Sequence, residues 1–344
     1  MLKQSKILYG GLAALARELQ KKEWADARYV ILLDENTLRH CAARLMVCVE
    51  TLMDTECIEV PAGEECKSLE VASQVWQSLL EGEADRDTVL VCLGGGALCD
   101  LGGFVAAGYK RGMRHILVPT TLLAMTDAAI GGKTAVDLGG VKNAIGHFYP
   151  AALTAIEPGF QETLSLKALH CGVMEMVKTA AVTDPVLYRQ LTSRYYKEEP
   201  SDNKVKAVAR LKARVVKADP YDHGIRKILN FGHTFGHAVE AYSKMPHGLA
   251  VGVGMLAAMY LSTRKTGLAE EVYRDYAGWL KQFVDVPHYT LRDIEQMLPL
   301  MHQDKKSAEG ELRCVLLQEP GAAVIDVPVS DHEVRDALLT VAKL

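Results

Sequence analysis

The sequence predicts two domains: an α/β domain with a parallel sheet over residues 1–163, and a mainly α-helical domain over residues 164–344. Three observations support this division. The chain is long enough for two domains. Continuous apolar runs alternate with helical patterns in its first half, and long helical patterns dominate its second half. No low-complexity linker separates the halves, so we expect them to share a cleft that holds the active site.

The apolar runs of the first half predict buried parallel strands. They cover residues 29–33, 88–93 and 115–118, and each ends at a polar, glycine or proline residue. A helical pattern lies between the first two, over residues 68–83. Uninterrupted apolar strands separated by helices are typical of a parallel sheet covered on both faces.

The second half repeats apolar residues at helical spacing. Helices are predicted over the segments LKALHCGVMEMVKTAAV, VKAVARLKARVVKA, HAVEAYS, GVGMLAAMYLSTRKTG and EEVYRDYAGWLKQFV. The apolar run 248–262 is too short to span a bilayer and is expected to be a buried helix.

The composition of the chain indicates which kinds of partner to expect and in which compartment the protein acts. Hydrophobic residues make up 49% of the chain and the net charge is −4, without a basic stripe, so neither disorder nor nucleic-acid binding is expected. The eight cysteines form no CxxC pair, and the first residues lack the pattern of a secretory signal. These features favour a cytoplasmic protein that acts on a small molecule.

A glycine-rich turn follows the second predicted strand, in Leu93 to Phe104 (LGGGALCDLGGF). Glycines allow close approach of a diphosphate, and the following helix would offer free N–H groups. The turn is not GxGxxG, and a plain strand-to-helix turn is an equally good interpretation. Polar clusters at two other strand ends, 34–36 and 119–121, favour a nucleotide site.

A second glycine-rich segment, Thr126 to Gly146, is expected to be an anion-binding loop. It carries Lys133, Lys142 and Asn143, which suit a phosphate or a carboxylate. Its GGKT lacks the first glycine of a P-loop, since Asp127 stands there, so ATP chemistry is disfavoured.

Three histidines cluster in the second half: His233, His237 and His247. The first two are four residues apart, so they would project from one helix face and could begin a divalent-metal site. Thr234 replaces the glutamate of an HExxH protease. Glu175, in an apolar helix, is the candidate third ligand, although a local pair with Lys178 would also explain it.

These motifs, in this order, resemble the 3-dehydroquinate synthase family. The likeness rests on GGGALCDLGGF, YKRG, PTTLLAMTDAAIGGKTAVDLGGVKNAIG, GVMEMVK, GIRKILNFGHTFGHAVE and the His-Gly before an apolar helix. It implies a Rossmann-like domain, NAD, zinc (or cobalt) and a homodimer. It also implies conversion of 3-deoxy-D-arabino-heptulosonate 7-phosphate to 3-dehydroquinate and phosphate, a step of the shikimate pathway.

The resemblance assigns roles to individual residues. The metal ligands would be Glu175, His233 and His247, and His237 would face the substrate. Residues expected to hold NAD are Asp34, Asn36, Glu64, Lys67, Gly94, Gly95, Gly96, Asp100, Thr120, Thr121, Asp127, Lys133 and Lys142. Residues expected around the substrate are Lys133, Asn143, Lys178, Lys212, Arg226, Asn230, His237, one of Lys305 and Lys306, and Arg111 from a neighbouring subunit.

Other functions stay open at this point. Another sugar-phosphate cyclase, acting on glucose 6-phosphate or sedoheptulose 7-phosphate, would share most motifs. Arg226 and Lys212 favour a substrate with a carboxylate, which those two sugars lack. A metal-dependent polyol dehydrogenase or a purely structural zinc site are the remaining alternatives.

Overall fold

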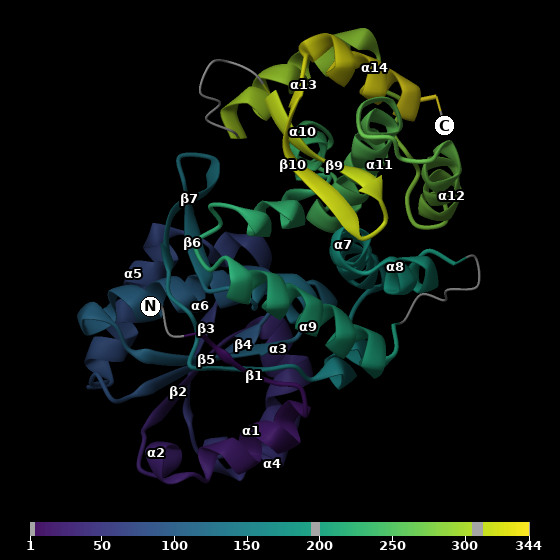
Figure 1. The fold of residues 1–344 in the computed structure, drawn as a ribbon. Helices are drawn as coiled ribbons and strands as arrows, with labels where there is room; N and C mark the ends of the chain where they lie inside the picture. Colours follow the sequence, from purple (N-terminus) through teal and green to yellow (C-terminus); the bar gives the residue numbers. More distant parts are fainter. Residues whose placement is uncertain (1–3, 194–199, 305–311, 344) are drawn as a thin grey trace. The chain divides into compact units, whose positions relative to one another are not determined.

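The computed structural model describes residues 4–193, 200–304 and 312–343, which fall into two compact units (Figure 1). The first unit comprises Met1–Leu169 and Ser201–Tyr221, and the second His170–Pro200 and Asp222–Leu344. The boundary expected at residue 163 therefore lies at residue 169. Residues 201–221, expected in the helical domain, belong to the α/β unit because helix α9 (Asp202–Ala218) packs on it. Lys305 and Lys306 lie outside the described residues.

The first unit is built on a six-stranded parallel sheet, which confirms the predicted fold class. Its strand order is β1-β8-β5-β4-β2-β3. Every residue of β2 and β4 is buried, as expected for central strands covered on both faces. The strands are β1 (Lys6–Leu8), β2 (Tyr29–Asp34), β3 (Glu56–Val60), β4 (Val89–Gly94), β5 (Arg114–Pro119) and β8 (Leu153–Ala155).

Helices cover both faces of this sheet (Figure 1). Helices α5 and α6 form one apolar core with β2, β4 and β5. Close packing of α6 needs a glycine, since a Cβ at Gly102 would lie 2.2 Å from the Cys92 sulfur. The helices are α1 (Gly11–Leu19), α2 (Lys22–Ala25), α3 (Glu35–Thr37), α4 (Ala43–Cys48), α5 (Leu69–Glu81), α6 (Gly96–Gly108) and α9.

The predicted anion-binding loop is largely a β-hairpin. Strands β6 (Lys133–Leu138) and β7 (Val141–Phe148) pair antiparallel through the two-residue turn Gly139–Gly140. Both glycines have positive φ, 59° and 80°, as a type I′ turn requires. Most of β7 is exposed, so this hairpin offers its polar side chains to solvent.

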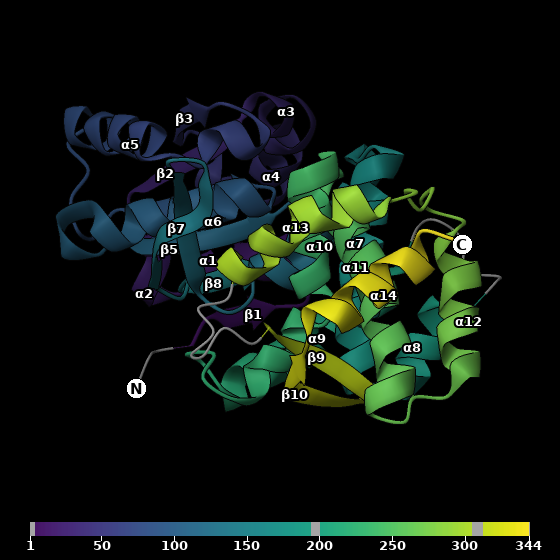
Figure 2. The same ribbon diagram turned by 90° about the horizontal axis from the view of Figure 1, so that it is seen from above.

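The second unit is mainly helical, and α10 and α11 pack against each other at its centre (Figure 2). An antiparallel hairpin, β9 (Leu312–Glu319) and β10 (Ala322–Val329), was not predicted. Among the described helices, none combines the length and apolar character that a membrane span requires. The helices are α7 (Leu166–Thr183), α8 (Pro185–Leu191), α10 (His233–Ser243), α11 (His247–Lys265), α12 (Glu270–Leu280), α13 (Leu291–Asp304) and α14 (Asp331–Val341).

Candidate active site

The carboxyl ends of β2, β4 and β5 bring the predicted strand-end residues to one edge of the sheet. The Thr120 amide donates to the carbonyl of Gly94 at 2.9 Å, which joins the ends of β5 and β4. Gly95 lies against Thr121, whose methyl would be 3.1 Å from an added Cβ. Asp34 ends β2, and its Oδ1 accepts from the Thr37 amide at 2.8 Å and so caps α3. This edge is where open α/β sheets bind ligands.

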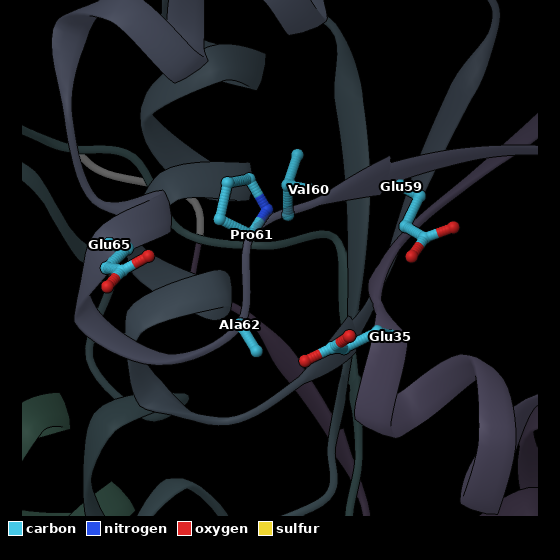
Figure 3. Close-up of a pocket in the computed structure, with 6 residues that line it drawn as sticks. All are labelled: Glu35, Glu59, Val60, Pro61, Ala62 and Glu65. Atoms are coloured by element: carbon cyan, nitrogen blue, oxygen red, sulfur yellow. The ribbon is translucent and has the colours of Figure 1, made fainter.

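A pocket of about 420 Å³ opens beside the ends of β2 and β3 (Figure 3). Carboxylates dominate its polar lining, which suits hydroxyl and amino donors and disfavours an added phosphate. Asn36 lies in α3, directly after the lining residue Glu35. The lining residues are Glu35, Glu59, Val60, Pro61, Ala62 and Glu65.

Lys67 and Asp100 form a buried ion pair near the glycine turn. The distance from Lys67 Nζ to Asp100 Oδ2 is 2.6 Å, and Lys67 is only 7% exposed. Burial raises the pKa of Asp100 to about 6, although the Lys67 ammonium acts in the opposite direction. The pair therefore places one charged donor and one carboxylate beside Gly94–Gly96, where both were expected to meet NAD.

Lys212 and Asp127 form a second pair within the first unit. Lys212 Nζ lies 2.6 Å from Asp127 Oδ1 and also donates to the Asp127 carbonyl at 2.7 Å. Lys133 begins β6 and Lys142 lies on exposed β7, 3.8 Å from Glu64 in an ion pair. Asn143, next to Lys142, has a positive φ of 53°, and its backbone N–H donates to Asp137 Oδ1 at 2.7 Å.

In the second unit, Glu175 of α7 lies close to two histidines, His233 at the start of α10 and His247 at the start of α11. Glu175 Oε1 lies 3.7 Å from His233 Nε2 and 3.4 Å from His247 Nε2. Glu175 is 1% exposed, and its Oε2 lies 2.5 Å from Lys178 Nζ. The structure thus brings together the three side chains that were expected to hold a metal ion.

Glycines allow these helices to approach. An added Cβ at Gly248 would lie 2.2 Å from the Cys171 carbonyl oxygen, so α11 begins in backbone contact with α7. A Cβ at Gly254 would lie 2.1 Å from the Gly232 carbonyl oxygen, which closes α11 onto the start of α10. Small residues at these crossings set the separation of the histidines.

Both histidines are oriented by their other ring nitrogen. His233 Nδ1 contacts the Phe231 carbonyl at 3.3 Å, and His247 Nδ1 contacts Glu240 Oε2 at 2.8 Å. With Nδ1 as the donor, Nε2 of each ring keeps its lone pair on the side of Glu175, the arrangement usual in metal sites.

The donor set fits a zinc ion. Glu175 Oε2 faces the Lys178 ammonium at 2.5 Å, whereas Oε1 faces the Nε2 atoms of both imidazoles at 3.4 and 3.7 Å, so a cation held by Oε1 and the two rings would suit this buried carboxylate. One carboxylate and two imidazoles leave an open position on tetrahedral zinc. Nitrogens of His233, His237 and His247 also lie within 4.8 Å of one another, so a ligand set that includes His237 stays possible by distance.

The surroundings of Glu175 and His233 favour the deprotonated forms that bind metal ions, whereas those of His247 favour its protonated form. Burial, helped by the Lys178 ammonium, holds the pKa of His233 well below its usual value. The pKa of Glu175 is also held well below its usual value: burial opposes this, but Lys178 and the histidines outweigh it. For His247, burial lowers the pKa, yet hydrogen bonding to Glu175 and Glu240 raises it to about 9, so a metal ion would have to displace its proton.

The other residues predicted to bind NAD or the substrate lie partly in the first unit and partly in the second. His237 lies on α10 one turn after His233, with ring centroids 5.2 Å apart. Arg226 is buried, and both it and Asn230 lie in the short helix Ile225–Asn230 of the second unit. Glu64 lies in the turn Gly63–Cys66, and exposed Arg111 lies in the turn Tyr109–Arg111, both in the first unit.

The sequence interpretation missed Glu240. Its signal was present, because Glu240 lies in the histidine-rich segment and shares α10 with His233 and His237. Only the fold shows that α11 turns back and brings His247 against it.

Two family models match this chain in succession. The model described as 3-dehydroquinate synthase N-terminal matches residues 57–171, and the C-terminal model matches residues 172–307. A 3-dehydroquinate synthase from Dehalococcoides mccartyi is 37% identical over 333 residues, covering 94% of this chain and 92% of the relative. One from Chlorobaculum parvum is 36% identical over 340 residues, covering 93% of each.

Solved structures share the whole fold. A 2-epi-5-epi-valiolone synthase from Streptomyces hygroscopicus, with NAD+ and Zn2+ bound, is 26% identical, with a TM-score of 0.81 over 100% of this chain and 98% of its own. A 2-deoxy-scyllo-inosose synthase complexed with carbaglucose-6-phosphate, NAD+ and Co2+ has a TM-score of 0.83 at 21% identity, covering 97% and 96%. The fold alone does not separate these cyclases, and the family assignment rests on the two family models together with curated relatives at 36–37% identity over most of the chain. The chain belongs to the 3-dehydroquinate synthase family.

Proposed function

We propose that this chain converts 3-deoxy-D-arabino-heptulosonate 7-phosphate to 3-dehydroquinate and phosphate, with NAD and zinc as cofactors. The observation that carries the proposal is the convergence of Glu175, His233 and His247 in a chain of this family. Three such ligands fit a catalytic zinc site with an open position.

The first unit would bind NAD at the carboxyl edge of its sheet. Bound NAD would take a hydride from the substrate and later return it, so that no reduced cofactor accumulates. Gly94–Gly96 and the start of α6 would receive the diphosphate. The acidic pocket beside β2 and β3 would accept ribose hydroxyls and disfavour the additional phosphate of NADP.

The second unit would hold zinc and one part of the substrate. Bound zinc would polarise substrate hydroxyls and lower their pKa. His237, one turn from His233, would face the substrate and move a proton at its ring nitrogen. Lys178 would keep Glu175 ionised, since its ammonium is 2.5 Å away.

Cationic and amide side chains would hold the two anionic ends of the substrate. Buried guanidinium and ammonium groups bind carboxylate and phosphate more strongly than exposed ones because water screens them less. They would fix the phosphate and stabilise it as it departs. We assign this role to three buried cations, Lys178, Lys212 and Arg226, and to the more exposed Lys133, Asn143 and Asn230.

We also propose a cytoplasmic homodimer in which Arg111 completes the site of the partner subunit. Six of the eight cysteines are buried and two are exposed, a pattern compatible with a reducing compartment. Arg111 is exposed on a turn with positive φ at Lys110, Arg111 and Gly112, a conformation that fixes the direction of the loop.

The test is to incubate the purified chain with the heptulosonate phosphate, NAD and zinc. We expect phosphate release without accumulation of NADH. Phosphate release from glucose 6-phosphate or sedoheptulose 7-phosphate instead would identify another cyclase. NADH accumulation with a polyol would identify a dehydrogenase, and no turnover of any of these substrates would overturn the proposal.

A further inference from the structure

Glu240 makes a short contact with a candidate metal ligand. Its Oε2 lies 2.8 Å from His247 Nδ1, and its side chain is only 14% exposed. Glu240 comes from the last turns of α10, and His247 is the first residue of α11, so the contact joins two helices that cross through glycines. It is independent of Glu175, which approaches the opposite nitrogen of the same ring.

The two candidate histidine ligands are therefore supported differently. The Nδ1 of His233 meets a neutral backbone carbonyl at 3.3 Å, whereas the Nδ1 of His247 meets a carboxylate at 2.8 Å. A charged acceptor binds an imidazole N–H more strongly and increases electron density at the other ring nitrogen. His247 is also the more exposed of the two side chains, 35% against 14%, so it has less packing to fix its orientation.

We propose that Glu240 is a positioning residue that holds His247 in the tautomer and orientation needed to bind the metal ion. The inference rests on the proposed metal site and deepens it. Glu240 lies on the Nδ1 side of the ring, so it acts through His247 while Nε2 points toward Glu175. The Lys178 ammonium offsets the charge of Glu175, and Glu240 supplies a second carboxylate on the other side of the His247 ring.

The experiment measures zinc affinity by competition with a chromogenic chelator, using the full chain and the variants Glu240→Gln and Glu240→Ala. We expect 10- to 100-fold weaker binding for Glu240→Ala, the range found for outer-sphere partners of metal ligands. The zinc affinity of Glu240→Gln should lie between those of the unsubstituted chain and Glu240→Ala. The glutamine amide oxygen still accepts the Nδ1 proton of His247, but it lacks the negative charge. Cobalt loading provides a second readout, since the absorption bands of Co2+ should change in Glu240→Ala if His247 turns.

Glu295→Gln is the matched control, because Glu295 lies on α13 and pairs with Arg335 at the surface. Circular dichroism without metal should show the same helical content for all four proteins, so that a loss of zinc affinity does not reflect a loss of the fold. Zinc affinity and cobalt spectra unchanged in both Glu240 variants would overturn the inference while leaving the proposed function intact. Failure of the unsubstituted chain to bind zinc at all would instead overturn the metal site itself.

Discussion

Several buried lysines of this chain are paired with carboxylates. Lys67 pairs with Asp100, Lys178 with Glu175 and Lys212 with Asp127, each within 2.6 Å. Removing one member of such a pair leaves an unpaired buried charge, which costs about 3–5 kcal/mol. Loss of activity in a lysine variant at these positions must therefore be compared with its loss of stability.

His237→Ala should slow turnover by about 10²- to 10⁴-fold, the contribution of a positioned acid or base. Zinc should stay bound, because Glu175, His233 and His247 remain. Phosphate release and metal content of the dialysed protein measure the two effects. A variant that loses its zinc completely would show that His237 is a ligand, as the distances among the three histidines permit.

His115 should make stability depend on pH. It is 1% exposed on β5, stacks on Tyr149, and has no hydrogen-bond partner for either ring nitrogen among the described residues. Burial lowers its pKa to about 4. Below pH 6.5 the unfolded chain takes up a proton that the folded chain refuses, so the free energy of unfolding falls as pH decreases from 6.5 to 4. At pH 5 this loss is about 2 kcal/mol, at 1.36 kcal/mol for each pH unit below 6.5.

His115→Phe keeps the ring and removes the titration. Urea unfolding at pH 7 and pH 5 should show a loss of stability smaller by about 2 kcal/mol in the variant than in the unsubstituted chain. Parallel losses in the two proteins would exclude His115 as the cause.

At the scale of elements, the crossing of α11 over α7 determines whether the candidate ligands meet. Gly248→Ala would place a methyl 2.2 Å from the Cys171 carbonyl oxygen, and backbone atoms cannot yield as a side chain can. We expect a loss of about 1–3 kcal/mol in stability. Zinc affinity should also fall, because α11 must move and its first residue is His247. Thermal unfolding and chelator competition check both effects.

Gly278→Ala is the control for this prediction. It also lies within a helix, α12, but no atom lies within 4 Å of an added Cβ. Its stability should be unchanged or raised by up to about 1 kcal/mol, because alanine favours the helix. Equal effects of the two substitutions would contradict the packing argument.

The elements with strong periodicity were predictable and those with mixed signals were not. The apolar runs at 29–33, 88–93 and 115–118 are strands β2, β4 and β5, because continuous burial requires continuous apolar residues. The hairpin β6–β7 was taken for a loop, since its glycines and lysines resemble one. Its alternating residues and the Gly139–Gly140 turn were the signal for a hairpin.

The candidate site was predictable only in part. The residue types of Glu175 and the histidines suggested a metal site, and the helical spacing suggested the pair His233 and His237. That His247 and Glu175 approach His233 depends on how α7 and α11 cross, which no local pattern determines. The Glu240 contact depends on the same crossing and was missed for that reason.

At the scale of the whole molecule, the proposed homodimer predicts complementation between two inactive variants. Arg111→Ala and Glu175→Ala proteins should each be inactive alone. Mixed by unfolding and refolding together, half of the dimers are mixed, and each mixed dimer holds one intact site, so about a quarter of full activity should return. Phosphate release checks this, and sedimentation checks that dimers form. No recovery in verified mixed dimers would show that Arg111 serves its own subunit.

The path of the chain between the units has a consequence for synthesis. The α/β unit is discontinuous in sequence. Its last helix, α9, comes after residues 170–200, which belong to the helical unit. A nascent chain that has emerged only as far as residue 169 lacks Lys212, the buried lysine that pairs with Asp127. We therefore expect the amino-terminal unit to complete its folding only after part of the second unit has been synthesised. Truncation after residue 169 should yield a product that chaperones retain, whereas a spliced chain that rejoins 201–221 to the first segment should be released.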